Sequence, residues 1–200
     1  MKYTEVYGLR KPESTDFYNI DDFNENTEII EQELNKLEEK SVVSAMMLTK
    51  NAGVQVMTGS QAFLLLSDAT PQVSAGNLQR ITTTMNNVLT EGDTQRVTGI
   101  KIGKGINRIR VDFSSAFRVS GNTDLYVRIM RLRGREFSPV YHSVNSVNDN
   151  LVTVTGSVFV EVQENDFIFL EGDMANSSAD VSMNVLYTDA ITSLCVQSIG

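Results

Sequence analysis

Two different hydrophobic periods divide this chain. Between residues 20 and 40 the apolar positions recur at alternating intervals of three and four, whereas beyond residue 45 they alternate with polar positions in short runs. Intervals of three and four place side chains on one stripe of a helix, and strict alternation places them on one face of a β-strand. The sequence therefore predicts an N-terminal helical segment, residues 1–44, followed by a β domain, residues 45–200.

The helical stripe has the spacing of a coiled-coil seam. Its members are Ile20, Phe23, Thr27, Ile30, Leu34 and Leu37. The stripe is shorter than the three to four heptads of a long coiled coil, and an isolated helix of this length is marginal in water. Two interpretations follow. The helix lies on its own domain, or it is a short stalk that joins copies of the chain; the stalk accounts better for the acidic residues on its other faces.

The later region contains many short runs rich in β-branched and aromatic residues, separated by turn residues. Alternation is cleanest in residues 109–113, 158–162 and 181–187. Short strands at this spacing predict an antiparallel β-sandwich or jelly roll. Residues 74–93 fit a strand, a short helix or a loop, and the pattern does not choose among them. The stretch around His142 is interpreted as an exposed turn.

Charge is distributed in three blocks beneath the overall −8. Residues 1–40 hold five basic and eleven acidic residues, residues 101–135 hold nine basic and two acidic, and residues 136–200 hold nine acidic residues and no Lys or Arg. Such asymmetry indicates charged faces that meet a partner.

Arginines alternate along two predicted strands of the basic block, which predicts a charged face opposite the apolar one. They are Arg108, Arg110, Arg131, Arg133 and Arg135. These guanidinium groups pair with the acidic second half, within the chain or between subunits, or they bind an anionic ligand. Nucleic acid is not expected, because the chain is acidic overall and shows no nucleic-acid-binding module.

The residues that catalysis or metal binding requires are sparse. The chain has one histidine and one cysteine, His142 and Cys195, and neither has a second such group nearby in sequence. A calcium site is conceivable at Glu164, Asp166, Glu171 and Asp173, but the twelve-residue loop of an EF-hand is missing. The Gly-Lys-Gly at 103–105 is interpreted as a turn. We therefore expect no enzymatic activity, no metal and no cofactor.

No membrane insertion or export is expected either. The first residues contain no apolar core of a signal peptide, and the densest apolar run, residues 62–66, is too short to span a bilayer.

The opening segment resembles the N-terminal segment of tail-fibre, baseplate and other minor structural proteins of phages and prophages of Gram-positive bacteria. That segment combines Leu-x-Lys-Pro, Thr-Asp, an acidic pair before Phe-Asn, and a helix with Ile/Leu spacing. The corresponding residues are Leu9, Lys11, Pro12, Thr15, Asp16, Asp21, Asp22, Phe23, Asn24, Ile29, Ile30, Leu34 and Leu37. The helix ends sooner than in many such proteins, which continue into a long fibre.

The β region is similar to C1q/TNF-type jelly-roll heads in the strand–turn–strand rhythm of residues 99–119 and 158–174. That resemblance implies a homotrimer with a compact head on a short stalk, and it transfers no catalytic residue.

Together the two resemblances imply a trimeric virion protein, made in the host cytoplasm. It would be a tail-fibre or baseplate receptor-binding protein. Its N-terminal segment would contact other virion proteins, and its head would recognise a host cell-surface polysaccharide or teichoic acid through loops or subunit clefts. The alternatives are a purely structural virion protein, such as a capsid or neck fibre or a decoration protein, and a depolymerase acting on cell-wall glycan.

Overall fold

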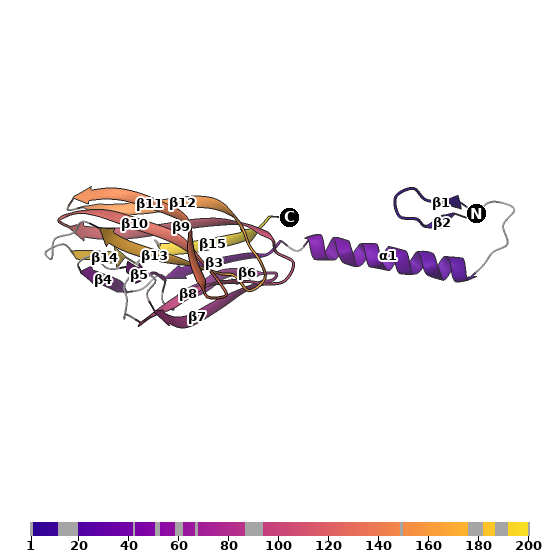
Figure 1. Ribbon diagram of the computed structural model, residues 1–200, viewed down its shortest axis with the longest axis horizontal. Coiled ribbons are helices and arrows are strands. Elements are labelled where there is room, and N and C mark those ends of the chain that lie inside the picture. Colours follow the sequence, from indigo (N-terminus) through magenta and orange to yellow (C-terminus); the bar gives the residue numbers. More distant parts are fainter. Residues whose placement is uncertain are drawn as a thin grey trace. The chain divides into compact units, whose positions relative to one another are not determined.

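The computed structural model (Figure 1) describes residues 2–11, 20–41, 43–50, 53–58, 62–66, 68–86, 94–148, 150–175, 182–186 and 192–199. The chain divides into two compact units, Met1–Val42 and Val43–Gly200. In the part of the chain so described, no helix has the length and apolar character needed to cross a membrane.

The first unit contains a small hairpin and the predicted helix. Strands β1 (Lys2–Tyr3) and β2 (Arg10–Lys11) pair antiparallel, and the Leu9 amide donates to the Thr4 hydroxyl at 2.9 Å to close the turn between them. Helix α1 runs from Ile20 to Ser41. Asp21 and Asp22 lie in its first turn, where carboxylates interact favourably with the positive end of the helix dipole. Pro12, Thr15 and Asp16 lie outside the described residues.

The second unit is built from antiparallel strands, which confirms the predicted sandwich class. The strands are β3 (Ala45–Lys50), β4 (Val54–Thr58), β5 (Ala62–Leu64), β6 (Thr70–Ala75), β7 (Leu78–Asn86), β8 (Thr94–Ile102), β9 (Arg108–Ser120), β10 (Asn122–Arg133), β11 (Glu136–Asn148), β12 (Leu151–Glu161), β13 (Phe167–Ala175), β14 (Ser182–Leu186) and β15 (Thr192–Ser198).

Two sheets form the layers of the sandwich. One has the order β11-β10-β13-β8-β7, with β5 also paired to β13. In the other, β12 pairs one side of the long strand β9, while β14 and β15 pair its other side and lead on to β4, β3 and β6. Strands β11 and β12 follow each other in sequence but are the outer strands of different sheets. Each of them is therefore an edge strand, and the two edges are adjacent without a backbone ladder between their described residues.

Strict alternation explains which side chains form the core. In β9, Ile109, Val111 and Phe113 are buried while Arg108 and Arg110 between and before them are exposed. The buried faces of both sheets meet in one large apolar cluster. A smaller cluster of Val97, Met130, Phe167 and Phe169 forms separately. Because Ile168 and Leu170 belong to the large cluster, the intervening aromatic residues of β13 lie on the opposite face of their sheet.

The interpretation of the His142 region as a turn is wrong. His142 lies within the thirteen-residue strand β11, paired with Arg128 of β10. Pro139 contributed to the prediction of a turn, because proline has no backbone N–H to donate to a neighbouring strand. Proline is tolerated on edge strands and at bulges, and β11 is an edge strand whose register shifts beside Pro139. In the undecided stretch 74–93, residues 74–75 end β6, residues 76–77 form a bend and residues 78–86 form β7. Residues 87–93 lie outside the described part.

Gly156 leaves room for two aromatic rings that pack between the sheets beside the outer strands β11 and β12. A side chain added at Gly156 of β12 would meet the ring of Phe113 at 2.4 Å and the ring of Tyr141 at 2.7 Å. These two rings pack edge-to-face with centroids 5.8 Å apart. Tyr141 belongs to β11 and Phe113 to β9, so the contact links the two sheets through side chains.

Candidate binding surfaces

The predicted seam of the helix is a row of exposed apolar side chains. Ile20, Phe23, Ile30 and Leu34 are 64%, 60%, 46% and 55% exposed. Thr27 is also exposed, and its hydroxyl donates to the Phe23 carbonyl at 3.0 Å. Nothing is described of the side chain of Leu37. Exposed apolar residues in a continuous row are typical of an interaction surface.

The hairpin is fixed to a different face of the same helix through Arg10. The Arg10 backbone amide donates to Asn26 Oδ1 at 2.7 Å, and Asn26 Nδ2 donates back to the Arg10 carbonyl at 2.9 Å. The guanidinium group also pairs with Asp22 and, at 2.6 Å, with Glu25. These partners lie roughly a third of a turn around the helix from the seam. The hairpin is therefore held to α1 by polar contacts that do not use the seam.

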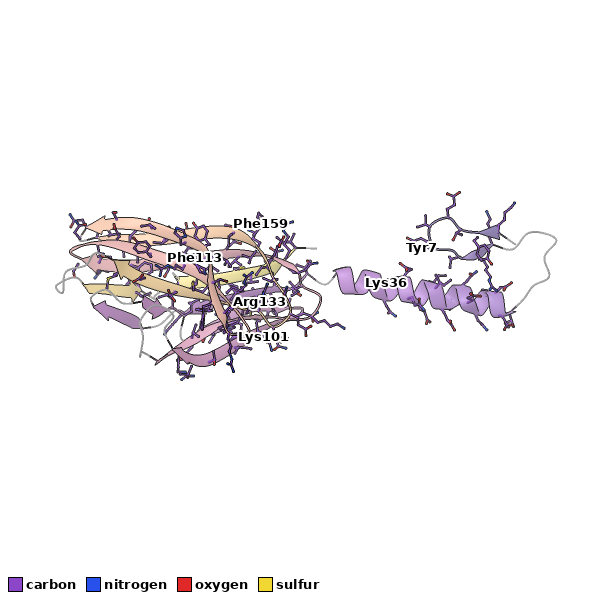
Figure 2. The ribbon with its side chains drawn as sticks, viewed as in Figure 1. Tyr7, Lys36, Lys101, Phe113, Arg133 and Phe159 are labelled. Carbon is purple, nitrogen blue, oxygen red and sulfur yellow. The ribbon has the colours of Figure 1, made fainter. Side chains whose placement is uncertain are left out.

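The five arginines predicted as a charged face lie in different sheets. Arg108 and Arg110 belong to β9, Arg131 and Arg133 to β10 in the other sheet, and Arg135 to the turn that follows. Figure 2 labels Arg133 among the side chains of the sandwich.

Ion pairs within the described part of the chain neutralise two of these arginines, Arg110 and Arg133. Arg110 pairs with Asp112 on its own strand at 2.9 Å. Arg133 donates to both oxygens of the buried Asp166, at 2.9 and 2.8 Å. Burial alone would raise the pKa of Asp166, but its bonds from Arg133 and from the Gln163 amide prevail and lower that pKa.

Arg131 is held by neutral acceptors. It donates to the Glu161 carbonyl at 3.1 Å and to the Ser138 hydroxyl at 3.3 Å, while its buried Nε has no partner among the described residues. Arg108 and Arg135 are exposed.

A further arginine, which the pattern did not single out, forms a buried charge cluster in the sandwich. Arg128 of β10 bridges Glu171 and Asp173 of β13, at 3.1 Å to each. Its guanidinium group lies 5.3 Å from the centroid of the Tyr126 ring. Glu171 is fully buried, and its Oε2 has no partner in the part of the chain that the structure describes. Burial raises the pKa of Glu171 to about 7, against the opposing effect of Arg128.

Three of the four candidate calcium ligands pair with arginines instead. Asp166, Glu171 and Asp173 face arginines, and no cluster of three His, Cys, Asp or Glu residues with metal-binding geometry occurs among the described residues. His142 is exposed on β11. Cys195 is half-buried in β15, and burial raises the pKa of its thiol.

The described surface of the sandwich includes two open grooves. The larger, of about 420 Å³, is lined by residues 144–148 and 150–152 at the adjoining ends of β11 and β12. The smaller, of about 270 Å³, includes Gln79, Lys101, Lys104 and Glu164. Sequence reasoning expected binding residues in loops but named neither groove. The larger one surrounds a single turn of the chain, whereas the smaller one combines three segments that are far apart in sequence.

Comparison with solved structures identifies the sandwich as a TNF-like jelly roll. Murine APRIL at pH 8.5 matches with a TM-score of 0.53 and 9% identity, covering 78% of this chain and 99% of that one. Eiger TNF from S. frugiperda matches with a TM-score of 0.54 and 6% identity, covering 80% and 94%. No family model and no curated protein matches the sequence. At these identities the likeness concerns the fold.

Proposed function

We propose that this chain is a homotrimeric, non-enzymatic virion protein of a phage of Gram-positive bacteria. In this proposal the α1 helices associate along their seam, and the N-terminal hairpin contacts another virion protein. The β-sandwich head binds a glycan on the host surface. The alternative, a purely structural virion protein, shares the assembly and lacks the binding.

The exposed seam is the observation that carries the proposal. Fully burying a large apolar side chain contributes about 1.5–3 kcal/mol, so covering four that are about half exposed contributes roughly 3–6 kcal/mol per chain. An amphipathic helix whose own unit leaves that row uncovered gains this energy only from contacts outside that unit, with the sandwich of its own chain or with another chain. The heptad spacing favours other copies of the same helix as that partner.

The sandwich supplies the second argument. Phe159 is a large apolar side chain on the outer strand β12, and it is 63% exposed. The free edge of such a strand is a usual place for further association. The TNF-like fold and the resemblance of the opening segment agree with an oligomeric head. Three weak sites carried on one assembly gain avidity on a repetitive surface without any new contact.

Light scattering tests the assembly on the intact chain. We expect three times the chain mass for the natural protein, and a smaller mass for the double variant Ile30→Asp, Leu34→Asp with its β circular dichroism retained. The matched control, Glu28→Ala and Gln32→Ala, changes exposed positions off the seam and should keep the trimer. A monomeric natural protein at micromolar concentration contradicts the proposal.

Cell binding separates the two virion roles. Labelled protein should decorate permissive Gram-positive cells, and particles that lack the protein should adsorb poorly. Particles that contain the protein yet adsorb equally well without it favour the purely structural role.

A further inference from the structure

Three short connections of the sandwich meet around the smaller groove. The amide of Asn165 donates to the Ile102 carbonyl at 2.8 Å, and the Ile102 amide donates to the Asp166 carbonyl at 2.8 Å. On the other side, Asn77 Nδ2 donates to the Lys104 carbonyl at 3.0 Å. The end of β8 is therefore bonded both to the turn that precedes β13 and to the bend that precedes β7, and the groove of about 270 Å³ lies among these segments.

Contacts within the chain fix the walls of this groove. A side chain added at Gly103 would lie 2.1 Å from the Asn77 carbonyl oxygen, so glycine allows these two segments to approach each other closely. The Asn77 amide donates to Ser44 Oγ at 2.9 Å, and Arg133 holds both oxygens of Asp166. The groove is thus formed before any ligand binds, as is usual for binding sites.

Lys101 and Gln79 project from the outward face of their sheet. They are direct partners in the pairing of β8 with β7, and directly paired residues share one face of a sheet. Ile100 and Ile102, the neighbours of Lys101, are fully buried in the core, so alternation places Lys101 on the opposite face. Both side chains line the groove. Figure 2 labels Lys101 at the same end of the sandwich as Arg133.

The two ammonium groups of the groove are not neutralised by the chain. Lys101 is half-buried and Lys104 is exposed, and neither ammonium group forms an ion pair or hydrogen bond with another described residue. By contrast, Arg128 and Arg133 pair with carboxylates. Glu164 is the one acidic residue among the described lining residues. The groove therefore carries a net positive charge, although the chain as a whole carries −8.

This set of side chains suits a phosphodiester joined to a polyol. Phosphate oxygens accept hydrogen bonds from lysine, which binds them as a point charge. Hydroxyl groups beside the phosphate can donate to Glu164, and they can both donate to and accept from the amide of Gln79. The described lining contains no aromatic ring, so it lacks the stacking surface that is typical of sites for single-stranded nucleic acid.

We infer that the smaller groove binds a phosphodiester group of a polyol-phosphate polymer, such as a glycerol-phosphate chain, through Lys101 and Lys104. This inference rests on the proposed function and narrows it, because it favours a phosphate-bearing teichoic acid over a neutral polysaccharide. It also gives a role to the start of the basic block, residues 101–135, whose two lysines the ion pairs of the chain leave unused.

The test measures binding of the full-length chain to an immobilised glycerol-phosphate polymer. The variants are Lys101→Gln, Lys104→Gln and the double variant, in which glutamine keeps a polar side chain without the charge. The matched control, Arg96→Gln, removes one positive charge from the opposite end of β8. Arg96 forms an exposed ion pair with Asp68, which contributes little to stability. All variants should keep the thermal unfolding and the mass in solution of the natural chain, so that lost avidity is not the cause of weaker binding.

The natural chain and Arg96→Gln should bind the polymer with similar affinity, and this affinity should fall as salt is added. Each single variant should bind about fourfold more weakly and the double variant about fifteenfold, as expected for losing exposed charge interactions. Unchanged binding by the double variant, or no binding by the natural chain, overturns the inference. Tighter binding to neutral oligosaccharides of glucose, galactose or N-acetylglucosamine, or to a single-stranded oligonucleotide of equal charge, overturns it as well.

Cell binding distinguishes failure of the site from failure of the function. Equal decoration of permissive cells by the natural chain and the double variant overturns the inference while the proposed function stands. Polymer binding that depends on the two lysines, without decoration of any permissive cell, supports the inference and contradicts the receptor role.

Discussion

Replacing Glu171 with glutamine should remove a pH dependence from the stability of the sandwich. Glu171 is fully buried, one of its oxygens accepts from Arg128 at 3.1 Å, and burial raises its pKa from 4.5 to about 7. The folded protein thus keeps a proton that the unfolded chain releases at lower pH. This group stabilises the folded state fully below pH 4.5, and the contribution is lost as the pH rises through 7.

The magnitude follows from the separation of the two pKa values. One pKa unit corresponds to about 1.4 kcal/mol, so the free energy of unfolding should fall by about 3 kcal/mol between about pH 4 and about pH 8 from this group. Glutamine has nearly the same shape and no charge over this range. In Glu171→Gln the same contribution should be below about 1 kcal/mol.

Urea unfolding at several pH values, followed by circular dichroism, measures this difference. Circular dichroism is the probe because the chain has no tryptophan to report by fluorescence. One protein concentration must be used throughout, because the stability of an oligomer depends on concentration. The control Asp173→Asn removes the other carboxylate paired with Arg128 and should retain most of the pH dependence. Parallel pH profiles for the natural protein and Glu171→Gln would refute the reasoning.

Two other substitutions test individual ion pairs. Asp166→Asn should lower the melting temperature by about 5 °C, because it removes the charge from two hydrogen bonds to Arg133. The lowered pKa of Asp166 means that the natural protein loses stability as the pH falls below the unfolded pKa of 3.8. This acid-induced loss should be absent in Asp166→Asn. An unchanged melting temperature in calorimetry would show that the pair contributes nothing. Arg10→Ala removes the ion pairs to Asp22 and Glu25 but keeps the two backbone bonds to Asn26. It should loosen the hairpin on α1, so that amide hydrogens of residues 2–11 exchange severalfold faster, about what the loss of roughly 1 kcal/mol produces. The exposed neighbour Lys11→Ala should leave exchange unchanged, and equal protection in both variants would contradict the role of the Arg10 side chain.

Local patterning predicted the class of each unit because hydrophobic period is a property of consecutive residues. The three-and-four spacing of Ile30 and Leu34 and the strict alternation around Val111 each correspond to one backbone geometry, and the structure has a helix and a strand there. Strand β11 was not predicted from its local pattern. Its edge position tolerates Pro139, and its solvent-facing residues dilute the apolar signal.

Only the tertiary structure decided which charged side chains form ion pairs and where the surface has grooves. Arg128 reaches Glu171 because β10 lies beside β13, although the two residues are far apart in sequence. Strands β11 and β12 are consecutive in sequence but join different sheets, which no local pattern specifies. The sequence by itself determined the elements and which of their faces point inward. Pairing between strands is set by the burial of all apolar faces at once. The packing of the two sheets therefore determined the ion pairs and the raised pKa of Glu171.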